Sequence, residues 1–386
     1  MTGLSLRDAA PQVSIRPVAH VGRAQRPASP LKIAMLQRFL PGSSQGGVGH
    51  FTDQLCECLA ARGHDVTVFS LDPAPPGAGY SVVQPHEGER VVRGKLGSIF
   101  GFGLWLARQD LSQFDVVHAM GDNHLLCTRT AVVRTLHGSA LGEALHARRL
   151  ATKALFASIY PLELVGIVRA TRTATDSAAS MRHFPFVRAR TIPNGVADEF
   201  FVSSGPKSVN PSVLFVGHRM HDRKRAHLLL REFQRVVRPA LPSAELWLVC
   251  DDAVAAPGVR CFRGIETEAL AELYRRAWVF CLPSSYEGFG RPYAEAMASG
   301  TPVVSTPNPG AGEVLGNGAY GDIVPAARVG RALLSLLSDG ERRDALARIG
   351  RIRACDFRWE GVASQYEDLY WEAIAKAASA RWRWSA

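Results

Sequence analysis

The fold of this chain is decided by residues 286–304, which read YEGFGRPYAEAMASGTPVV. An apolar run from Trp278 to Pro283 comes just before them and predicts a buried strand. A glycine-containing loop follows, then a short helix from about Pro292 to Ser299, and then a second strand from Pro302 to Ser305. This order predicts neighbouring parallel strands joined by a crossover helix.

Two glutamates are important in this stretch because of where they fall. Glu287 lies on the loop, and Glu295 lies on the helix about two turns further on. Glycines let the backbone approach a ligand closely, and exposed N–H groups at a helix start attract phosphate. Carboxylates beside such a loop can accept hydrogen bonds from sugar hydroxyls. The arrangement suits a nucleotide sugar; the alternative is a surface turn with two incidental glutamates.

Strands and helices alternate along the rest of the chain. In the first half, strands are predicted at 32–37, 65–70, 115–120, 131–135, 172–175 and 191–192. In the second half they are predicted at 212–216, 245–250, 259–262, 279–282 and 302–305, with helices at about 226–238, 267–277 and 292–299. Such alternation implies parallel sheets with helices on both faces. The segment from Asn194 to Pro211 is rich in Gly, Pro, Ser and Asn and is predicted to be a linker.

The stretch that decides the fold also resembles a known family motif. The segments EGFG (287–290) and EAMASGTPVV (295–304) match, nearly residue for residue, the Glu-x7-Glu motif of retaining glycosyltransferases of family four, which have the GT-B fold. The resemblance covers roughly residues 31–378 and is most specific in the second half. It implies an α/β chain with two Rossmann-like doubly wound domains facing a central cleft, and a C-terminal helix that crosses back to the first domain.

The resemblance implies a domain organisation and an activity. The expected parts are a disordered tail (1–30), an acceptor domain (31–205), a nucleotide-sugar-binding domain (206–360), a helix that packs back on the acceptor domain (361–379) and a tail (380–386). The implied activity is transfer of a sugar from a nucleoside-diphosphate sugar to a hydroxyl of a glycan, lipid or small-molecule acceptor, with retention of configuration. Two alternatives stay open: a GT-B sugar-nucleotide epimerase and a non-enzymatic sugar-binding scaffold.

The resemblance assigns donor contacts to residues of the second half. Glu287 is expected to contact hydroxyls of the donor sugar, and Glu295 to hold the ribose hydroxyls. Phe289 and Gly290 belong to the same loop and are expected beside the donor. Gly310 lies in NPGAGE (308–313), which resembles the family's glycine-rich loop; its N–H groups could reach the donor, and a purely structural loop is the alternative.

A pair of basic residues is expected to neutralise the donor diphosphate as it leaves. The family places an Arg shortly after a Gly and a Lys five residues later, and Arg219 and Lys224 keep that five-residue spacing. Charged hydrogen bonds to phosphate are the strong kind. This chain departs from the family in having His218 before the Arg and Arg225 in place of the usual Gly after the Lys, so Arg223 is the fallback.

Two residues of the first half complete the expected site. His137 ends a predicted strand, and it matches the histidine with which family members contact the donor sugar from across the cleft. A structural histidine that caps the loop is the alternative. Gly47 belongs to a glycine-rich strand-to-helix turn, Gln45 to Gly49, that can approach a ligand closely. His118 is a second candidate histidine but is expected to be structural.

Neither a metal nor another cofactor is expected. The Asp-x-Asp motif of metal-dependent sugar transferases is absent, and Asp251-Asp252 only ends a strand. Arg219 and Lys224 can supply the positive charge that Mg²⁺ supplies elsewhere. The seven cysteines are irregularly spaced, which favours a reducing compartment and predicts a cytoplasmic protein.

Charge and apolar runs limit the partners. Lys and Arg number 45 against 35 Asp and Glu, a net charge of +10, but the basic residues are scattered, so nucleic acid is not expected as a partner. The longest apolar run, Ala154 to Leu162, has nine residues and is too short to cross a bilayer. Residues 381–384 (RWRW) are either a solvated tail or an anchor for peripheral contact with the inner face of the membrane.

Overall fold

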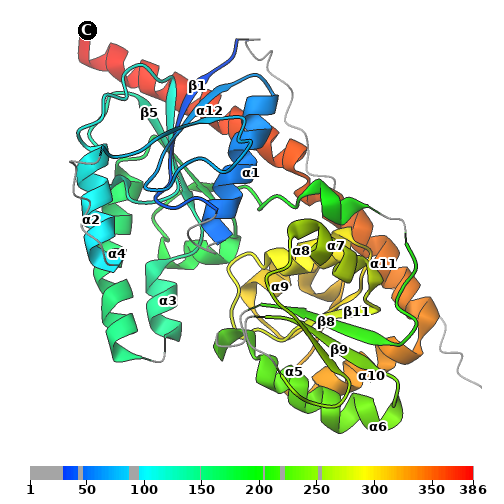
Figure 1. Cartoon of the computed structure of the whole chain (residues 1–386). Coiled ribbons are helices and arrows are strands. Elements are labelled where there is room, and N and C mark those ends of the chain that lie inside the picture. Colours follow the sequence, from blue (N-terminus) through cyan, green and yellow to red (C-terminus); the bar gives the residue numbers. More distant parts are fainter. Residues whose placement is uncertain are drawn as a thin grey trace, which may run out of the picture. The chain divides into compact units, whose positions relative to one another are not determined.

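The computed structural model describes residues 29–41, 47–86, 95–147, 149–202, 205–217, 222–250 and 254–385. The expected tail at 1–30 therefore lies almost wholly outside the described residues. Leu31–Ala386 forms one compact unit. It contains a seven-stranded sheet built from the first half of the chain and a six-stranded sheet built from the second half (Figure 1).

The first sheet has the strand order β3-β2-β1-β4-β5-β6-β7, and all neighbouring pairs are parallel. Its strands are β1 (Lys32–Leu36), β2 (Asp65–Phe69), β3 (Ser81–Val83), β4 (Val116–Ala119), β5 (Ala131–Leu136), β6 (Arg172–Thr175) and β7 (Ala189–Thr191). Every residue of β4 and β5 is buried, as expected for strands covered on both faces. β3 is not predicted from the sequence, and β7 begins two residues before the predicted strand at 191–192, with which it shares only Thr191.

Helices cover both faces of the first sheet. On one face, α1 (Gly47–Ala61) and α12 (Trp359–Ser385) share an apolar cluster with β1 and β5. On the other face, α2 (Lys95–Leu106) contributes Phe102 and Trp105 to a second cluster with β1 and β4. Helices α3 (Ala140–His146) and α4 (Leu150–Val168) follow β5 and pack against each other. The remaining short turns are η1 (Asn123–Leu125), η2 (Ala178–His183) and η3 (Asp198–Phe201).

The second sheet has the strand order β10-β9-β8-β11-β12-β13 and is also parallel. Its strands are β8 (Ser212–Val216), β9 (Glu245–Val249), β10 (Val259–Phe262), β11 (Val279–Leu282), β12 (Val303–Ser305) and β13 (Asp322–Ile323). The helical segments are η4 (Asp222–Lys224), α5 (Ala226–Glu232), η5 (Phe233–Val237), α6 (Arg238–Ala240), α7 (Thr267–Arg276), α8 (Arg291–Ala298), α9 (Pro309–Val314), η6 (Gly316–Gly318), η7 (Ala326–Arg328), α10 (Val329–Ser338), α11 (Gly340–Ala354) and η8 (Cys355–Phe357). The predicted helix at 226–238 contains a π-helical turn, η5.

The last helix, α12, crosses back to the first sheet as predicted (Figure 1). Its Tyr366 and Tyr370 are fully buried there, and the Tyr370 hydroxyl lies 2.7 Å from Nδ1 of His118 on β4. Glu367 accepts hydrogen bonds from Arg62 at 2.6 and 2.9 Å. The helix continues to Ser385, so the residues after 379 that we expected as a tail are helical. The side chains of 381–384 lie outside the described residues.

Helix α4 corrects the expectation that the chain has no membrane-length apolar helix. Its 19 residues, Leu150–Val168, are long and apolar enough to cross a bilayer by length and composition. The sequence interpretation stopped at Glu163, because a charged residue ends an apolar run. In the structure, α4 continues through Glu163, which is a good helix former, and the Glu163 carboxylate accepts a hydrogen bond from the Ala140 backbone N–H at 2.9 Å.

Candidate active site

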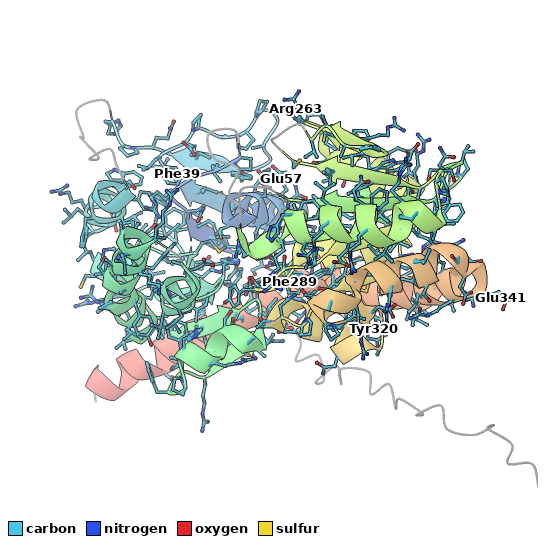
Figure 2. All side chains as sticks on the ribbon, turned by 90° about the horizontal axis from the view of Figure 1, so that it is seen from below. Phe39, Glu57, Arg263, Phe289, Tyr320 and Glu341 are labelled. Atoms are coloured by element: carbon cyan, nitrogen blue, oxygen red, sulfur yellow. The ribbon has the colours of Figure 1, made fainter. Side chains whose placement is uncertain are left out.

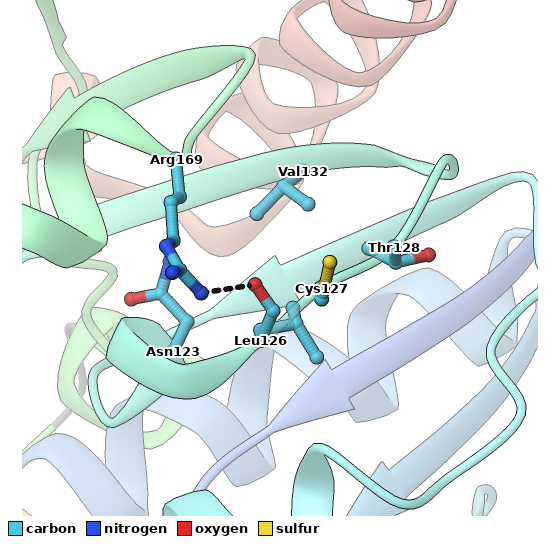
Figure 3. Close-up of a pocket in the computed structure, with 6 residues that line it drawn as sticks. All are labelled: Asn123, Leu126, Cys127, Thr128, Val132 and Arg169. Carbon is cyan, nitrogen blue, oxygen red and sulfur yellow. Dashed lines mark hydrogen bonds between the residues drawn. The ribbon is translucent and has the colours of Figure 1, made fainter.

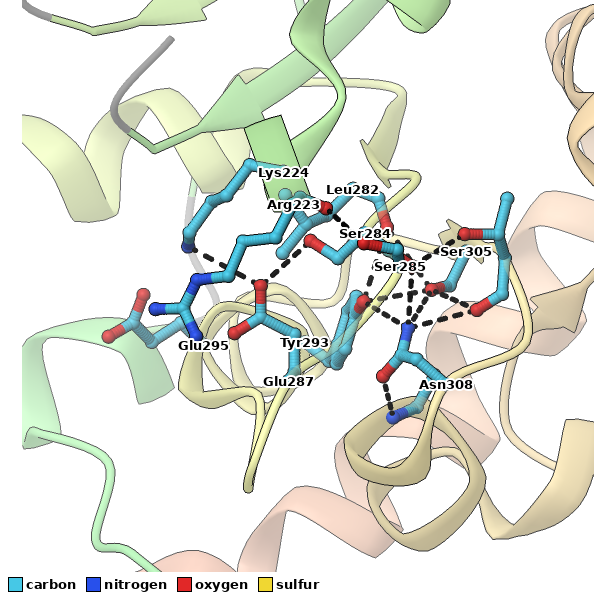
Figure 4. Close-up of polar contacts among 12 residues, drawn as sticks. Arg223, Lys224, Leu282, Ser284, Ser285, Glu287, Tyr293, Glu295, Ser305 and Asn308 are labelled. Carbon is cyan, nitrogen blue, oxygen red and sulfur yellow. Dashed lines mark hydrogen bonds and ion pairs between the residues drawn. The ribbon is translucent and has the colours of Figure 1, made fainter. Parts of the chain in front are cut away.

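Glu287 lies on the loop between β11 and α8, at the carboxyl end of the second parallel sheet, where open α/β folds bind ligands. It is only 7% exposed. The Ser284 hydroxyl donates a hydrogen bond to Glu287 Oε1 at 2.7 Å, and Lys224 Nζ lies 3.7 Å from the same oxygen (Figure 4). Among the described residues both contacts are made by Oε1, so Oε2 is left for a ligand.

Glu295 lies on α8 and is 5% exposed. The Tyr274 hydroxyl donates to its Oε2 at 3.1 Å, and Arg291 Nε donates to its Oε1 at 2.9 Å. Burial and then the Glu295 carboxylate raise the pKa of Tyr274 well above its usual value, so the hydroxyl remains a donor. Each carboxylate oxygen has a second lone pair. Glu295 is therefore held in place and can still accept a hydrogen bond from a ligand hydroxyl.

Two glycines shape the loop around Glu287. Gly290 precedes α8 with φ +88°, and a Cβ there would lie 2.5 Å from the Tyr293 ring. A Cβ on Gly310 would lie 2.5 Å from the carbonyl oxygen of Phe289, so α9 can pack against the loop only because this position is glycine. The Gly310 N–H donates to the Glu287 carbonyl at 3.0 Å. Gly310 thus allows α9 to pack closely against the loop that carries Glu287.

The Phe289 ring belongs to the core of the second half. Phe289, labelled in Figure 2, is 4% exposed. Its ring centroid lies 5.5 Å from that of Phe357. A donor would meet Phe289 through its backbone. The amide of Asn308 completes this region: it donates to the carbonyls of Ser284 and Thr306 at 3.2 and 2.9 Å and caps α9 through the Ala311 N–H.

The predicted basic pair is described only in part. Arg219 lies outside the described residues, as does His218. Lys224 ends η4, and its stem passes Gly217, where a Cβ would lie 2.5 Å from Lys224 Cδ. The fallback, Arg223, has its guanidinium 3.4 Å from Glu143 of α3. Arg225 takes the left-handed conformation, φ +51°, which explains why glycine suits the residue after the lysine.

His137 lies directly after β5, as the sequence predicts. Its Nδ1 is 3.4 Å from Asp176 Oδ2, its Nε2 is 3.4 Å from Met120 Sδ, and the Phe51 ring meets it edge-on at 4.6 Å. Asp176 is 4% exposed, and its Oδ1 is buried without a hydrogen-bond partner in the part of the chain that is described. The structure brings Glu287, Glu295 and Lys224 together on the second half, and His137 and Asp176 on the first.

The other two candidates of the first half, Gly47 and His118, differ in burial. Gly47 is the exposed first residue of α1, and a Cβ there would meet nothing within 4 Å; the preceding turn residues lie outside the described part. His118 is fully buried and hydrogen-bonded to Tyr370 and Thr135, each at 2.7 Å. Burial, with a smaller contribution from nearby His137, lowers the pKa of His118 to about 3. His118 is therefore a neutral structural residue, as expected.

A pocket of about 320 Å³ lies elsewhere, in the first half (Figure 3). It is lined by Asn123, Leu126, Cys127, Thr128, Val132 and Arg169. Arg169 donates a hydrogen bond across it to the Leu126 carbonyl at 2.8 Å. None of the predicted site residues lines it, so this pocket is separate from the candidate active site. In the described ranges, no three or more His, Cys, Asp or Glu residues are grouped to hold a metal ion.

Comparison with solved structures identifies the fold. Sucrose-phosphate synthase from Thermosynechococcus elongatus superposes with a TM-score of 0.72 at 23% identity, covering 89% of this chain and 99% of that one. Anabaena HepE, solved in complex with UDP and glucose, superposes with a TM-score of 0.66 at 17% identity, covering 88% and 99%. Two parallel doubly wound sheets with a last helix returning to the first define the GT-B fold of glycosyltransferases.

Sequence comparison then gives the family. Residues 45–200 match "Glycosyltransferase Family 4" and residues 210–339 match "Glycosyl transferases group 1". The chain belongs to family 4 of the glycosyltransferases and is a transferase enzyme. It is 29% identical over 377 residues to a phosphatidyl-myo-inositol mannosyltransferase of Mycobacterium tuberculosis, covering 86% of this chain and 94% of that protein. An MMP α-(1→4)-mannosyltransferase of Mycolicibacterium hassiacum is 42% identical over 121 residues, 30% of this chain and 29% of that protein.

Proposed function

We propose that this enzyme transfers a sugar from a nucleoside-diphosphate sugar to an acceptor hydroxyl, with retention of configuration and without a metal ion. The observation that carries the proposal is the pair of buried carboxylates, Glu287 and Glu295, beside Lys224 at the carboxyl end of the second sheet. Buried carboxylates with unused lone pairs are suited to a ligand with many hydroxyls. Anabaena HepE has been solved in complex with UDP and glucose and with UDP-glucose, which supports the same class of donor.

Each residue has a distinct role in the proposed donor complex. Glu295 accepts hydrogen bonds from the ribose hydroxyls, and Glu287 accepts them from the donor sugar. Lys224 exchanges its 3.7 Å contact with Glu287 for the donor diphosphate. The backbone of Phe289, Gly290 and Gly310 lines the donor, and Gly47 and His137 approach from the first half. Asp176 holds His137 through Nδ1, which leaves Nε2 toward the ligand in place of the weak contact with Met120.

The proposed transfer needs no covalent enzyme intermediate. The bond between the anomeric carbon and the diphosphate oxygen breaks, and a bond from the same carbon to the acceptor oxygen forms on the same face. The acceptor's proton passes to the leaving diphosphate oxygen. Lys224, together with Arg219 outside the described residues, stabilises the charge that develops on the diphosphate. EDTA should leave the rate unchanged, and a loss of activity restored by Mg²⁺ would contradict this role.

We propose a cytoplasmic location for this enzyme, supported by its cysteines. All seven cysteines are free thiols, which supports a reducing compartment and a cytoplasmic enzyme. A free thiol at the exposed Cys127 or Cys355 would otherwise be prone to oxidation. Mass spectrometry of the alkylated native protein tests the thiol state.

The proposal is tested by donor binding, turnover and product stereochemistry. Calorimetry with UDP- and GDP-linked hexoses should find a donor whose affinity falls in Glu287→Gln and Glu295→Gln but not in Glu341→Gln, an exposed control on α11. Proton NMR of the product should show the donor's anomeric configuration. An inverted linkage would contradict retention. Conversion of the donor in the absence of an acceptor would indicate an epimerase. Donor binding without turnover, whichever acceptor is supplied, would indicate a non-enzymatic scaffold.

A further inference from the structure

Helix α4 presents an apolar stripe to solvent. The residues Leu150, Ala154, Ala157, Pro161, Val165 and Val168, which we call the α4 stripe, recur every three or four positions and are all exposed. This spacing puts them on one face of the helix. Leu150 is 82% exposed and Val168 is 78% exposed, at the two ends of the stripe. Exposed apolar patches of this kind mark interaction sites.

The opposite face of α4 is fixed to the first half of the chain. Gly166 and Ile167 are buried, and the Tyr160 ring stacks on Phe184 at 5.6 Å. The Tyr160 hydroxyl donates to the His183 carbonyl at 2.6 Å, and Glu163 accepts from the Ala140 N–H. Crossing a bilayer would break these contacts and leave a carboxylate in hydrocarbon. Helix α4 lies at the edge of the first half of the chain (Figure 1), so its exposed stripe belongs to the surface of a folded unit.

Further exposed apolar side chains lie next to α4. Leu145, on α3, is 63% exposed, and α3 packs against α4. Phe186 is 65% exposed, and residues on either side of it, Phe184 and Val187, pack into a cluster with Tyr160 of α4. Exposed apolar side chains therefore also occur on segments that pack next to α4.

Cations outnumber acids around the α4 stripe. Residues 140–190 contain eight Lys and Arg and three acids, Glu143, Glu163 and Asp176. Glu143, on α3, lies 3.4 Å from the Arg223 guanidinium. Asp176 is buried beside His137, and Glu163 is hydrogen-bonded to the backbone of α3. The exposed charged residues that the structure describes in this segment are Arg149, Lys153, Arg169, Arg182 and Arg188.

We propose that the α4 stripe rests on the surface of an anionic lipid bilayer, with α4 lying in the interface plane and the protein bound peripherally. Apolar side chains enter the boundary between head groups and acyl chains, and the flanking cations meet anionic lipid. A second copy of the chain fits less well, because a two-fold contact sets the same patch against itself and brings these cations together. The proposal does not depend on the transfer reaction and would stand if the donor proposal failed.

The apolar part is tested by flotation with vesicles of phosphatidylcholine, with and without phosphatidylglycerol. Leu150→Glu/Val168→Glu removes both ends of the stripe. Val209→Glu/Ile352→Glu is the matched control, because Val209 and Ile352 are 96% and 68% exposed outside this surface and the charge change is the same. The unaltered chain and the control should float with the anionic vesicles, and the stripe variant should bind at least about tenfold more weakly. Equal binding of the two double variants would overturn the proposal.

The charge part uses a second matched pair. Arg149→Gln/Lys153→Gln should lower the partition to anionic vesicles by about fivefold per cation lost. Arg331→Gln/Arg348→Gln, two exposed arginines of α10 and α11, should leave it unchanged. Added NaCl should release the unaltered chain. Equal loss in the two pairs, or binding that resists salt, would overturn the proposal.

Hydrogen exchange of the unaltered chain keeps the test independent of variant folding. Anionic vesicles should slow exchange in residues 145–188. Protection confined to residues 380–386, or binding lost only when they are removed, would assign the contact to the C-terminus and overturn the proposal. A dimer in analytical ultracentrifugation that Leu150→Glu/Val168→Glu dissolves would assign the stripe to a second copy and would also overturn it.

Discussion

Removing the Glu295 carboxylate should destabilise the fold as well as weaken donor binding. In Glu295→Ala the Tyr274 hydroxyl, 3.1 Å from Glu295 Oε2, loses its acceptor. Tyr274 is fully buried, and a buried donor without a partner costs about 1–3 kcal/mol. The Arg291 side chain is 40% exposed, so its lost ion pair adds at most about 1 kcal/mol. We expect the free energy of unfolding to fall by about 1–3 kcal/mol, mainly because of Tyr274.

A double-mutant cycle in urea measures this effect. Tyr274→Phe removes the hydroxyl that Glu295→Ala would leave without an acceptor, so the double variant should lose less than the sum of the single variants. The coupling should be about 1 kcal/mol or more. Glu295→Gln keeps an oxygen for Tyr274, so it should recover stability while still weakening donor binding in calorimetry. Strictly additive losses would refute the argument, because they would show that the two side chains do not depend on each other.

Three further predictions concern His118, the loop glycines and Lys224. Burial lowers the pKa of His118 to about 3. Between about pH 6.5 and 3, the unfolded chain therefore binds a proton that the folded chain does not. The free energy of unfolding should fall with falling pH by up to about 1.4 kcal/mol per pH unit. His118→Gln should flatten this slope between about pH 6.5 and 5 in urea titrations; an unchanged slope would contradict it. Gly310→Ala places a Cβ 2.5 Å from the Phe289 carbonyl oxygen and should lower the free energy of unfolding by about 1–3 kcal/mol. In Gly47→Ala the new Cβ meets nothing within 4 Å, so the Tm should stay unchanged. Equal Tm values for the two variants would contradict this prediction. Lys224→Ala should lower kcat about 10²–10³-fold, and Arg331→Ala should not; near-normal turnover would move the role to Arg223.

The sequence predicts the fold well because its signals are local and repeated. Glu287, Gly290 and Glu295 fall in one contiguous stretch, and the strand before it and the strand after it are buried as their apolar runs predict. The strands of the second sheet that are long enough to show a pattern lie where expected. Only the two-residue strand β13 is too short to be read.

The partners of the site residues could not be predicted in the same way. Tyr274 is on the amphipathic helix α7, where a tyrosine is typical of a core, and nothing in the sequence relates it to Glu295, 21 positions later. Ser284 and Asn308 come from separate loops that meet only in the folded chain. Asp176 is different: it directly follows β6, so the strand-end argument that predicts His137 could have found it.

The return of α12 to the first sheet has a consequence for the order in which the chain matures. The core on that face is completed by residues made almost last: Val362, Ala363, Tyr366, Leu369, Tyr370 and Ala373. Strand β7 ends at Thr191 and α12 begins at Trp359, so the ribosome makes the whole second sheet in between. At about 5–20 residues per second this takes roughly 10–30 s. The carboxyl-terminal half can therefore finish folding before the amino-terminal half. A chain cut before Trp359 contains all the strands but lacks the residues that cover the apolar face of β1 and α1, which is then open to chaperones or aggregation.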